Sequence, residues 1–146
     1  MADVPVKVIY ATVQALLASG ASVGSGSFIS AGTLGSAEHS DYPAADFALT
    51  VDFGAAVAAG VSINLYRADM DIDAAGTGDA VVPSATNKYI FLGVFPIPSG
   101  QSASAVYSLP DMPLAHKATY WIENNTAQNM QAGWKLAATP KTLGTS

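Results

Sequence analysis

The sequence predicts an all-β protein, an antiparallel β-sandwich that is jelly-roll-like and has about eight strands. Apolar and polar residues alternate with a period of two in several short segments, the pattern of strands with one buried face. Turn residues separate these segments at short intervals, as in sandwiches and jelly rolls. The helical candidates, 13–18 and 55–59, are too short for stable helices, so we expect turns or single helical turns there.

The clearest alternation lies in the segment 47–53, where Phe47, Leu49, Val51 and Phe53 alternate with small or polar residues. The run 89–95 is continuously apolar, so we expect both of its faces to be covered. We expect the last two strands to pair with each other across a polar connection. The predicted strands are 4–13, 27–29, 47–53, 61–65, 89–95, 103–109, 119–124 and 133–138.

A chain of 146 residues is the size of one domain, so we expect residues 1–146 to form a single β-sandwich domain. The Gly- and Ser-rich segment 19–36 predicts a flexible loop, or alternatively an arm that becomes ordered against a neighbouring subunit. We expect a frayed tail at 139–146. Residues 8–37 carry no charge, but glycines and serines interrupt them, and a strand is a simpler interpretation than a membrane span or signal peptide.

The charge balance excludes several classes of partner. Charged residues make up only 12% of the chain, and the formal net charge is −5. DNA and anionic membranes attract clusters of Lys and Arg, so we expect no nucleic-acid partner and no membrane partner. The chain has no cysteine, which excludes disulfides, thiolate nucleophiles and Cys-ligated zinc.

Two sequence features could suggest an enzyme, and neither is convincing. Residues 20–24 match the G-x-S-x-G nucleophile elbow, but the Gly- and Ser-rich residues after them do not form the required helix. His39 and His116 are the only histidines, and both lie in polar surroundings that predict solvated surface side chains. We therefore expect no catalytic residues, no cofactor and no enzymatic activity.

The segment 69–79 is acidic. Asp69, Asp71 and Asp73 alternate as in the first half of a calcium loop, and Asp79 follows. Ala74 and Ala80 occupy the positions at which a calcium loop needs Gly and a bidentate Glu. We therefore expect an acidic hairpin loop and assign no metal site.

Two further features have a structural and a functional interpretation. Asn124-Asn125-Thr126 is formally a glycosylation sequon, but it predicts only a polar turn when no secretion signal is present. Trp121 and Trp134 could stack on a sugar ring, although their spacing within strands favours core packing.

Several segments resemble a group of small tailed-phage virion proteins, the capsid decoration or cement proteins. The resemblance covers most of the chain with short motifs, and it is poor at 19–36 and 96–116. The similar segments are Val6-Lys7-Val8 with Tyr10, the loop 69–79 after Tyr66, Thr86-Asn87-Lys88-Tyr89, Leu92-Gly93-Val94, and Tyr120-Trp121-Ile122-Glu123-Asn124.

The resemblance implies a homotrimer on the outer surface of the phage capsid, where it bridges and stabilises neighbouring major capsid proteins without catalysis or cofactor. It also implies assembly in the host cytoplasm and a final location in the virion. One alternative is another virion component, such as a head fibre or tail protein. The other is a carbohydrate-binding β-sandwich module in which Trp121 or Trp134 is the stacking ring.

Overall fold

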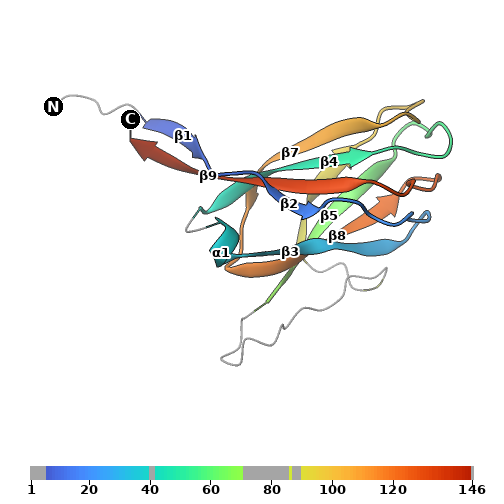
Figure 1. Ribbon diagram of the computed structural model, residues 1–146. Coiled ribbons are helices and arrows are strands. Elements are labelled where there is room, and N and C mark those ends of the chain that lie inside the picture. The colour runs from blue at the N-terminus through green and yellow to red at the C-terminus, as the bar shows by residue number, and fades with distance from the viewer. Residues whose placement is uncertain (1–5, 40–41, 71–85, 87–89, 146) are drawn as a thin grey trace.

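The computed structural model describes residues 6–39, 42–70, 86 and 90–145 (Figure 1). These residues form nine β-strands and one helical turn, α1 (Ser36–His39). The strands make two antiparallel sheets that pack face to face, so the predicted β-sandwich is confirmed.

The strand order in the two sheets is that of a jelly roll. Strands β1 and β2 both pair with β9, so together they occupy the position of a single first strand. If β1 and β2 are counted as strand 1 and β3 to β9 as strands 2 to 8, the two sheets have the orders 1-8-3-6 and 2-7-4-5. The first sheet contains β1 (Val6–Tyr10), β2 (Gln14–Leu17), β9 (Lys135–Thr145), β4 (Ala44–Val51) and β7 (Ala105–Pro113); the second contains β3 (Phe28–Gly35), β8 (Lys117–Asn125), β5 (Ser62–Asp69) and β6 (Ile90–Pro96).

The core lies between the two sheets and follows the predicted alternation. In β4 every second residue is buried, including Phe47, Leu49 and Val51. The rings of Phe47 and Tyr120 meet with centroids 5.0 Å apart and so join β4 of the first sheet to β8 of the second. Further buried core residues are Ile63, Leu65, Phe95, Ile122, Met130, Trp134, Leu136 and Ala138.

The predicted first strand is interrupted. Tyr10 lies opposite Lys141, and Gln14 lies opposite Ala138. The first segment therefore advances four residues from Tyr10 to Gln14 while β9 advances only three, from Ala138 to Lys141. The interruption faces Pro140, whose carbonyl accepts a hydrogen bond from the Ala11 N–H but which has no N–H to return one. Residues 14–17 of the helical candidate 13–18 are therefore strand, whereas 55–59 is irregular as expected.

Two segments expected to be irregular are largely strand. The prediction of a loop or arm at 19–36 is wrong for its second half, because β3 pairs with β8 and buries Ala31 and Leu34. The prediction of a frayed tail at 139–146 is also wrong, since β9 continues to Thr145 with β1 beside it. Strand β3 was not predicted in full because it contains Ala and Gly, which have little β propensity of their own.

Two expectations about neighbouring strands also fail. Strands β8 and β9 do not pair with each other, because residues 126–134 cross from the second sheet to the first. In the described part of the apolar run, 90–95, Phe91 and Val94 are exposed, so the two faces of β6, the edge strand of its sheet, are not both covered.

Candidate interaction surface

The segment that matches a nucleophile elbow has a packing role. Gly20 is buried, its N–H donates to the carbonyl of Trp134 at 2.8 Å, and its own carbonyl accepts from the N–H of Gly133 at 2.8 Å. Ser22 is exposed in the connection between β2 and β3. The segment therefore lacks the strand-to-helix turn that presents a catalytic serine.

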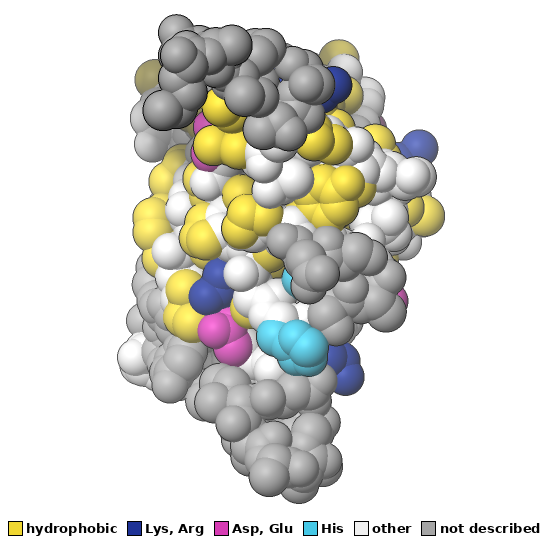
Figure 2. Space-filling view, turned by 90° about the vertical axis from the view of Figure 1, so that its left-hand side faces the viewer, with side chains coloured by type: hydrophobic (Ala, Val, Ile, Leu, Met, Phe, Trp, Pro, Cys, Tyr) yellow, Lys and Arg dark blue, Asp and Glu magenta, His cyan; other side chains and the backbone are white. Residues whose placement is uncertain are grey.

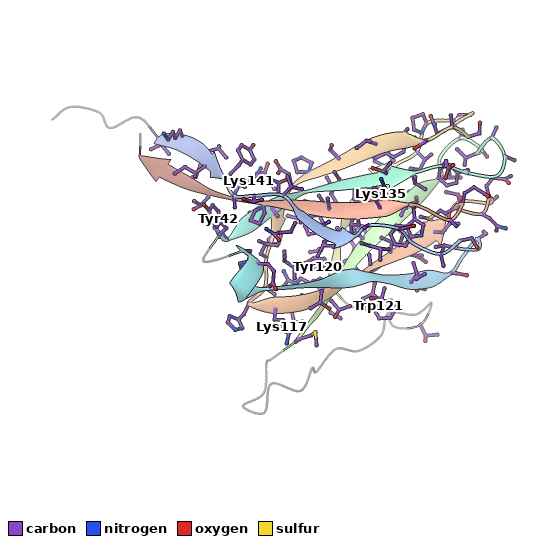
Figure 3. All side chains as sticks on the ribbon, in the orientation of Figure 1. Tyr42, Lys117, Tyr120, Trp121, Lys135 and Lys141 are labelled. Atoms are coloured by element: carbon purple, nitrogen blue, oxygen red, sulfur yellow. The ribbon has the colours of Figure 1, made fainter. Side chains whose placement is uncertain are left out.

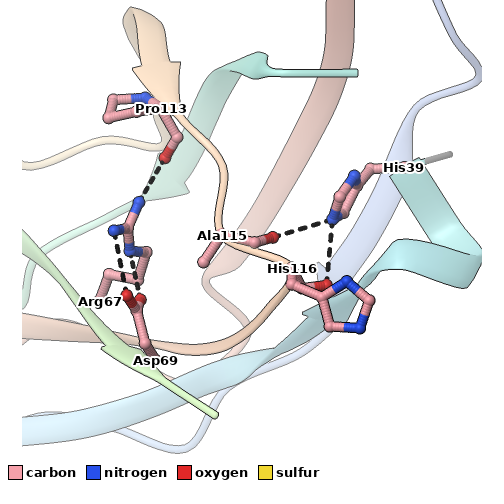
Figure 4. Close-up of polar contacts among 6 residues, drawn as sticks. All are labelled: His39, Arg67, Asp69, Pro113, Ala115 and His116. Atoms are coloured by element: carbon pink, nitrogen blue, oxygen red, sulfur yellow. Dashed lines mark hydrogen bonds and ion pairs between the residues drawn. The ribbon is translucent and has the colours of Figure 1, made fainter. Parts of the chain in front are cut away.

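His39 is buried, which corrects the expectation of a surface side chain. Its Nε2 lies 2.9 Å from the carbonyl oxygen of Ala115 and 3.3 Å from that of His116 (Figure 4). Because both partners are acceptors, Nε2 carries a proton and donates it. The polar neighbours of His39 predicted exposure, but the ring joins α1 to the β7–β8 connection. The side chain of His116 is exposed as expected.

Asp69 is engaged in an ion pair at the end of β5. Its Oδ2 accepts a hydrogen bond from Nη2 of Arg67 at 3.2 Å, and Nη1 of Arg67 donates to the carbonyl of Pro113 at 2.9 Å (Figure 4). Asp71, Asp73 and Asp79 lie outside the described residues. Among the residues that the structure does describe, no three His, Asp or Glu side chains gather closely enough to hold a metal ion.

The sequon residue Asn124 is fully buried, so the expected polar turn is an internal hydrogen-bonded one. Its Nδ2 donates to the carbonyls of Val23 at 2.9 Å and Gln128 at 2.8 Å. Its Oδ1 accepts from the N–H of Thr126 at 3.1 Å and from the Thr126 hydroxyl at 2.7 Å. With its whole amide used in this way, Asn124 fixes the crossing between the two sheets.

The two tryptophans lie in different environments. Trp134 is buried in the core, and its Nε1 donates to the carbonyl of Ala21 at 2.7 Å, so core packing is confirmed for this ring. Trp121 is paired in register with Tyr66 on the outer face of the second sheet and points away from the first sheet (Figure 3). A sugar-stacking role would therefore have to use Trp121.

A buried carboxylate lies on the same outer face. Glu123 accepts hydrogen bonds from the Tyr66 hydroxyl at 2.8 Å and from Nδ2 of Asn64 at 2.9 Å. Burial, followed by the hydrogen bond to Glu123 and its negative charge, raises the pKa of Tyr66 to about 12. Tyr66 thus remains a neutral donor, and the arrangement fastens β5 to β8.

The most unusual surface is a ribbon that projects from the sandwich, at the upper left in Figure 1. It consists of Val6–Tyr10 and Lys141–Thr145, and we call it the terminal ribbon. Strand β4 begins with Ala44 opposite Lys141, so beyond that point β1 is the only strand beside β9 among the described residues. A two-stranded ribbon by itself is marginally stable in water, so this element gains from a further contact.

The two faces of the terminal ribbon differ in character. Residues opposite each other in an antiparallel pair share a face, so Val8 and Leu143 lie together, as do Tyr10 and Lys141. Val6 extends this face, which continues the outer face of the first sheet. Lys7, Ile9, Thr142 and Gly144 share the opposite face, on which the Ile9 side chain covers Gly144.

The face that carries Val8 is apolar and open to solvent. The exposed fractions are 66% for Val6, 47% for Val8, 55% for Tyr10 and 72% for Leu143. Figure 2 looks onto this end of the molecule and shows hydrophobic side chains gathered in its upper half. Contiguous exposed apolar side chains of this kind mark interaction sites on soluble proteins.

A charge cluster fixes the base of the terminal ribbon. Nζ of Lys141 lies 2.5 Å from Oδ1 of Asp46 and 2.5 Å from Oδ1 of Asp111. Asp111 adopts a left-handed backbone with φ of 59°, and its N–H donates to Oδ1 of Asp46 at 2.9 Å. Nζ of Lys141 also lies 5.9 Å from the centroid of the Tyr10 ring.

This cluster shifts the pKa values of Asp46 and Lys141. Burial raises the pKa of Asp46, but hydrogen bonds from Lys141 and from the backbone of Asp111 outweigh it, and the net pKa lies below 3.8. Hydrogen bonds to Asp111 and then Asp46 raise the pKa of Lys141. Asp46 and Lys141 are therefore charged near neutral pH, and the ion pairs of Lys141 with Asp46 and Asp111 hold the ribbon to β4 and β7.

A hollow opens beside this cluster, where the terminal ribbon leaves the sandwich. Its volume is about 200 Å³, and its wall is largely apolar. It could admit one or two aliphatic side chains. The lining residues are Val8, Pro43, Ala44, Asp111, Lys141, Thr142 and Leu143.

The chain matches no family model, no curated protein and no solved structure. No helix among the described residues is long and apolar enough to cross a membrane. The terminal ribbon, the hollow and the charge cluster are therefore the features of the described structure that bear on function. Sequence reasoning missed this surface, because alternation in 4–13 has the same form whether the apolar face meets a core or another molecule.

Proposed function

We propose that this protein is a structural component of a tailed-phage virion that decorates the outer surface of the capsid, as a trimer, and bridges neighbouring major capsid proteins. The terminal ribbon carries this proposal, because a compact jelly roll with an apolar projecting arm is suited to connecting subunits. The resemblance of the motifs around Val6-Lys7-Val8 and Tyr120-Trp121-Ile122 to decoration proteins supports it independently.

The surface composition favours the same role. The outer face of the first sheet presents small uncharged side chains such as Ala48, Thr50, Ala137 and Thr139. Removing such residues from water costs little, whereas burying unpaired charges is expensive. A protein that binds the assembled shell more tightly than free capsid subunits stabilises the shell by mass action. Several contacts in each trimer would strengthen the binding through their effective concentration.

The test is to add the purified protein to expanded capsids that lack it and to image them by electron cryo-microscopy. We expect regular density on the outer shell and a higher temperature of capsid disruption. Bare capsids at saturating protein would refute the decoration role. Density confined to the tail or to a fibre would instead support the alternative of another virion component.

A second candidate function is carbohydrate binding, and it depends on Trp121. The ring lies on an outer sheet face near Tyr66, whose own ring is 5.6 Å from both Phe28 and Phe91, centroid to centroid. Oligosaccharides should then change tryptophan fluorescence, and Trp121→Ala should abolish the change. The buried Trp134 can be left in place as the internal reference.

A further inference from the structure

We propose that the hollow beside Leu143 is a binding site for an extended peptide strand of a partner, which adds to β9 at the position that β4 does not reach. The inference goes beyond the proposed function, because the site is defined by backbone groups, a recess and a carboxylate of this chain and not by any one assembly. The ligand is a strand that carries an aliphatic side chain and, on the same face, a basic one.

Strand β9 loses one of its two neighbours at Leu143. Ala44, the first residue of β4, lies opposite Lys141. In the same register, a longer β4 would place Tyr42 opposite Leu143. The chain turns away instead, because the N–H of Tyr42 donates to the carbonyl of His39 at 3.1 Å. At Leu143, β1 is therefore the only described strand that lies beside β9.

The backbone of Leu143 directs its N–H and C=O groups toward the side that β4 has left. The carbonyl of Pro140 accepts from the Ala11 N–H, so Pro140 directs its backbone toward β1 and β2. Bonding direction alternates along an antiparallel strand, so Thr142 also faces β1, whereas Lys141 and Leu143 face the other side. The Thr142 hydroxyl lies 3.5 Å from the Leu143 carbonyl, a long contact that leaves a lone pair for another donor. Such an edge selects an extended peptide as its ligand.

The hollow lies beside this edge, where a side chain of the added strand would be placed. Its volume is about 200 Å³, and Pro43 and Ala44 line it from the start of β4, whereas Val8 and Leu143 line it from the terminal ribbon. Residues opposite each other in an antiparallel pair share a face, so the ligand residue opposite Leu143 places its side chain on this apolar face. Pockets for alternate side chains give strand addition its specificity, and this one suits Val, Leu or Ile.

The charge at the rim of the hollow favours a basic residue in the ligand. Lys141 is paired with both Asp46 and Asp111, so one positive formal charge faces two negative ones. The side chain of Asp111 is 76% exposed, against 29% for Asp46, so Asp111 presents the uncompensated charge to solvent. Asp111 also lines the hollow. A Lys or Arg beside the aliphatic residue of the ligand is therefore attracted here, and an acidic residue is repelled.

The test is a titration of the isotope-labelled full-length protein with a synthetic peptide, followed by NMR of the backbone amides. The probe is a peptide with blocked ends, Thr-Lys-Thr-Val-Thr-Val-Thr, in which Lys and both Val share one face of a strand. We expect the Leu143 amide to shift and its N–H to become protected from hydrogen exchange. The same peptide N-methylated at both Val should bind at least ~10-fold more weakly, because it lacks the backbone donors of that face.

Leu143→Pro tests the edge of β9 directly. Proline is tolerated in an edge strand where the N–H faces solvent, so this change removes the donor on the open side and keeps the pairing with β1. We expect peptide binding to weaken about 10-fold. Leu143→Val is the matched control, because it keeps the N–H and an aliphatic side chain, and it should bind within about 2-fold of wild type. Far-ultraviolet circular dichroism checks folding, and the N-methylated peptide tests the same edge on wild type if Leu143→Pro does not fold.

Asp111→Asn tests the charge at the rim. Asn tolerates the left-handed backbone that Asp111 adopts with φ of 59°, so the change removes the carboxylate and keeps the local conformation. Wild type should prefer the Lys peptide over its counterpart with Glu by roughly 3–10-fold, and Asp111→Asn should lose this preference.

The outcomes separate this inference from the proposed function. An unchanged Leu143 amide at about 5 mM peptide, or equal binding of the N-methylated peptide, would overturn the strand site. Equal affinity of wild type for the Lys and Glu peptides would overturn the basic character of the ligand. The titration contains no capsids, so bare capsids in the imaging experiment would refute the decoration role and leave the strand site in place.

Discussion

Gly20 lies directly against the indole ring of Trp134, in a space that no larger residue can occupy. A Cβ atom at Gly20 would come within 2.1 Å of Cε2 and 2.2 Å of Nε1 of Trp134. The backbones of the two residues are also joined by a hydrogen bond of 2.8 Å. The glycine that begins the apparent nucleophile elbow is thus required by the packing of Trp134, the residue before β9, against the β2–β3 connection.

Gly20→Ala should therefore destabilise the protein. The buried indole cannot move away without disturbing the core, so we expect a loss of about 1–3 kcal/mol in the free energy of unfolding. Gly24→Ala is the control, because its Cβ would meet the Ser27 hydroxyl at an ordinary 3.5 Å. Urea unfolding followed by tryptophan fluorescence measures both. Equal stability of the two variants would contradict the packing role of Gly20.

Asn124→Ala should be more damaging than Asn125→Ala. The first change removes the buried amide that binds Val23, Thr126 and Gln128, and it leaves several of their polar groups without partners. We expect a cost of about 2–4 kcal/mol, since each unsatisfied buried group costs roughly 1–3 kcal/mol.

Asn125 is the natural control for that experiment. Its side chain is exposed, and surface substitutions usually stay within about 0.5 kcal/mol. Thermal unfolding followed by circular dichroism compares the two variants under identical conditions. The network would be unimportant for stability if Asn124→Ala melted at the wild-type temperature.

The regular strands of the sandwich were predictable because their apolar residues alternate in the same way as their buried positions. In β4 one face is buried, and Phe47, Leu49 and Val51 all lie on it. The fold class followed from repetition of this signal. Pairing was less predictable, since the strongly alternating β8 and the neighbouring β9 belong to different sheets.

The terminal ribbon and its base could not be predicted for a physical reason. The ribbon alternates like a core strand, and only its position beyond Ala44 leaves Val8 without a covering sheet. The Lys141 cluster joins residues from β4, β7 and β9, so no local spacing indicates it. His39 was misjudged likewise, because its hydrogen-bond partners lie 76 and 77 residues away.

His39→Ala should destabilise the end of the sandwich near α1. It removes the donor to the carbonyls of Ala115 and His116 and leaves a gap at a site that is only 6% exposed. A loss of about 1–3 kcal/mol follows from the unpaired acceptors and the lost packing. The control is His116→Ala, whose exposed ring predicts a change within about 0.5 kcal/mol. Equal urea midpoints for both variants would show that His39 contributes no more than a surface residue.

Lys141→Met should make the stability of the protein less dependent on pH in the acidic range. The folded-state pKa of Asp46 lies below its usual 3.8, in part because of hydrogen bonding to Lys141. A lowered carboxyl pKa stabilises the fold above the unfolded-state pKa, and this contribution is lost as the pH falls through the folded-state value. The melting-temperature difference between wild type and Lys141→Met should thus be largest near pH 7 and shrink below about pH 4.

Lys135→Met provides the control for this pH series. Lys135 lies on the same strand and the same outer face, but its side chain is exposed and lies far from Asp46 and Asp111 in the register of β9 with β4. Its difference from wild type should vary little between pH 3 and pH 7. If Lys141→Met and Lys135→Met followed the same curve, the carboxylates of Asp46 and Asp111 would not be coupled to Lys141. The ribbon would then be held at its base by backbone pairing alone.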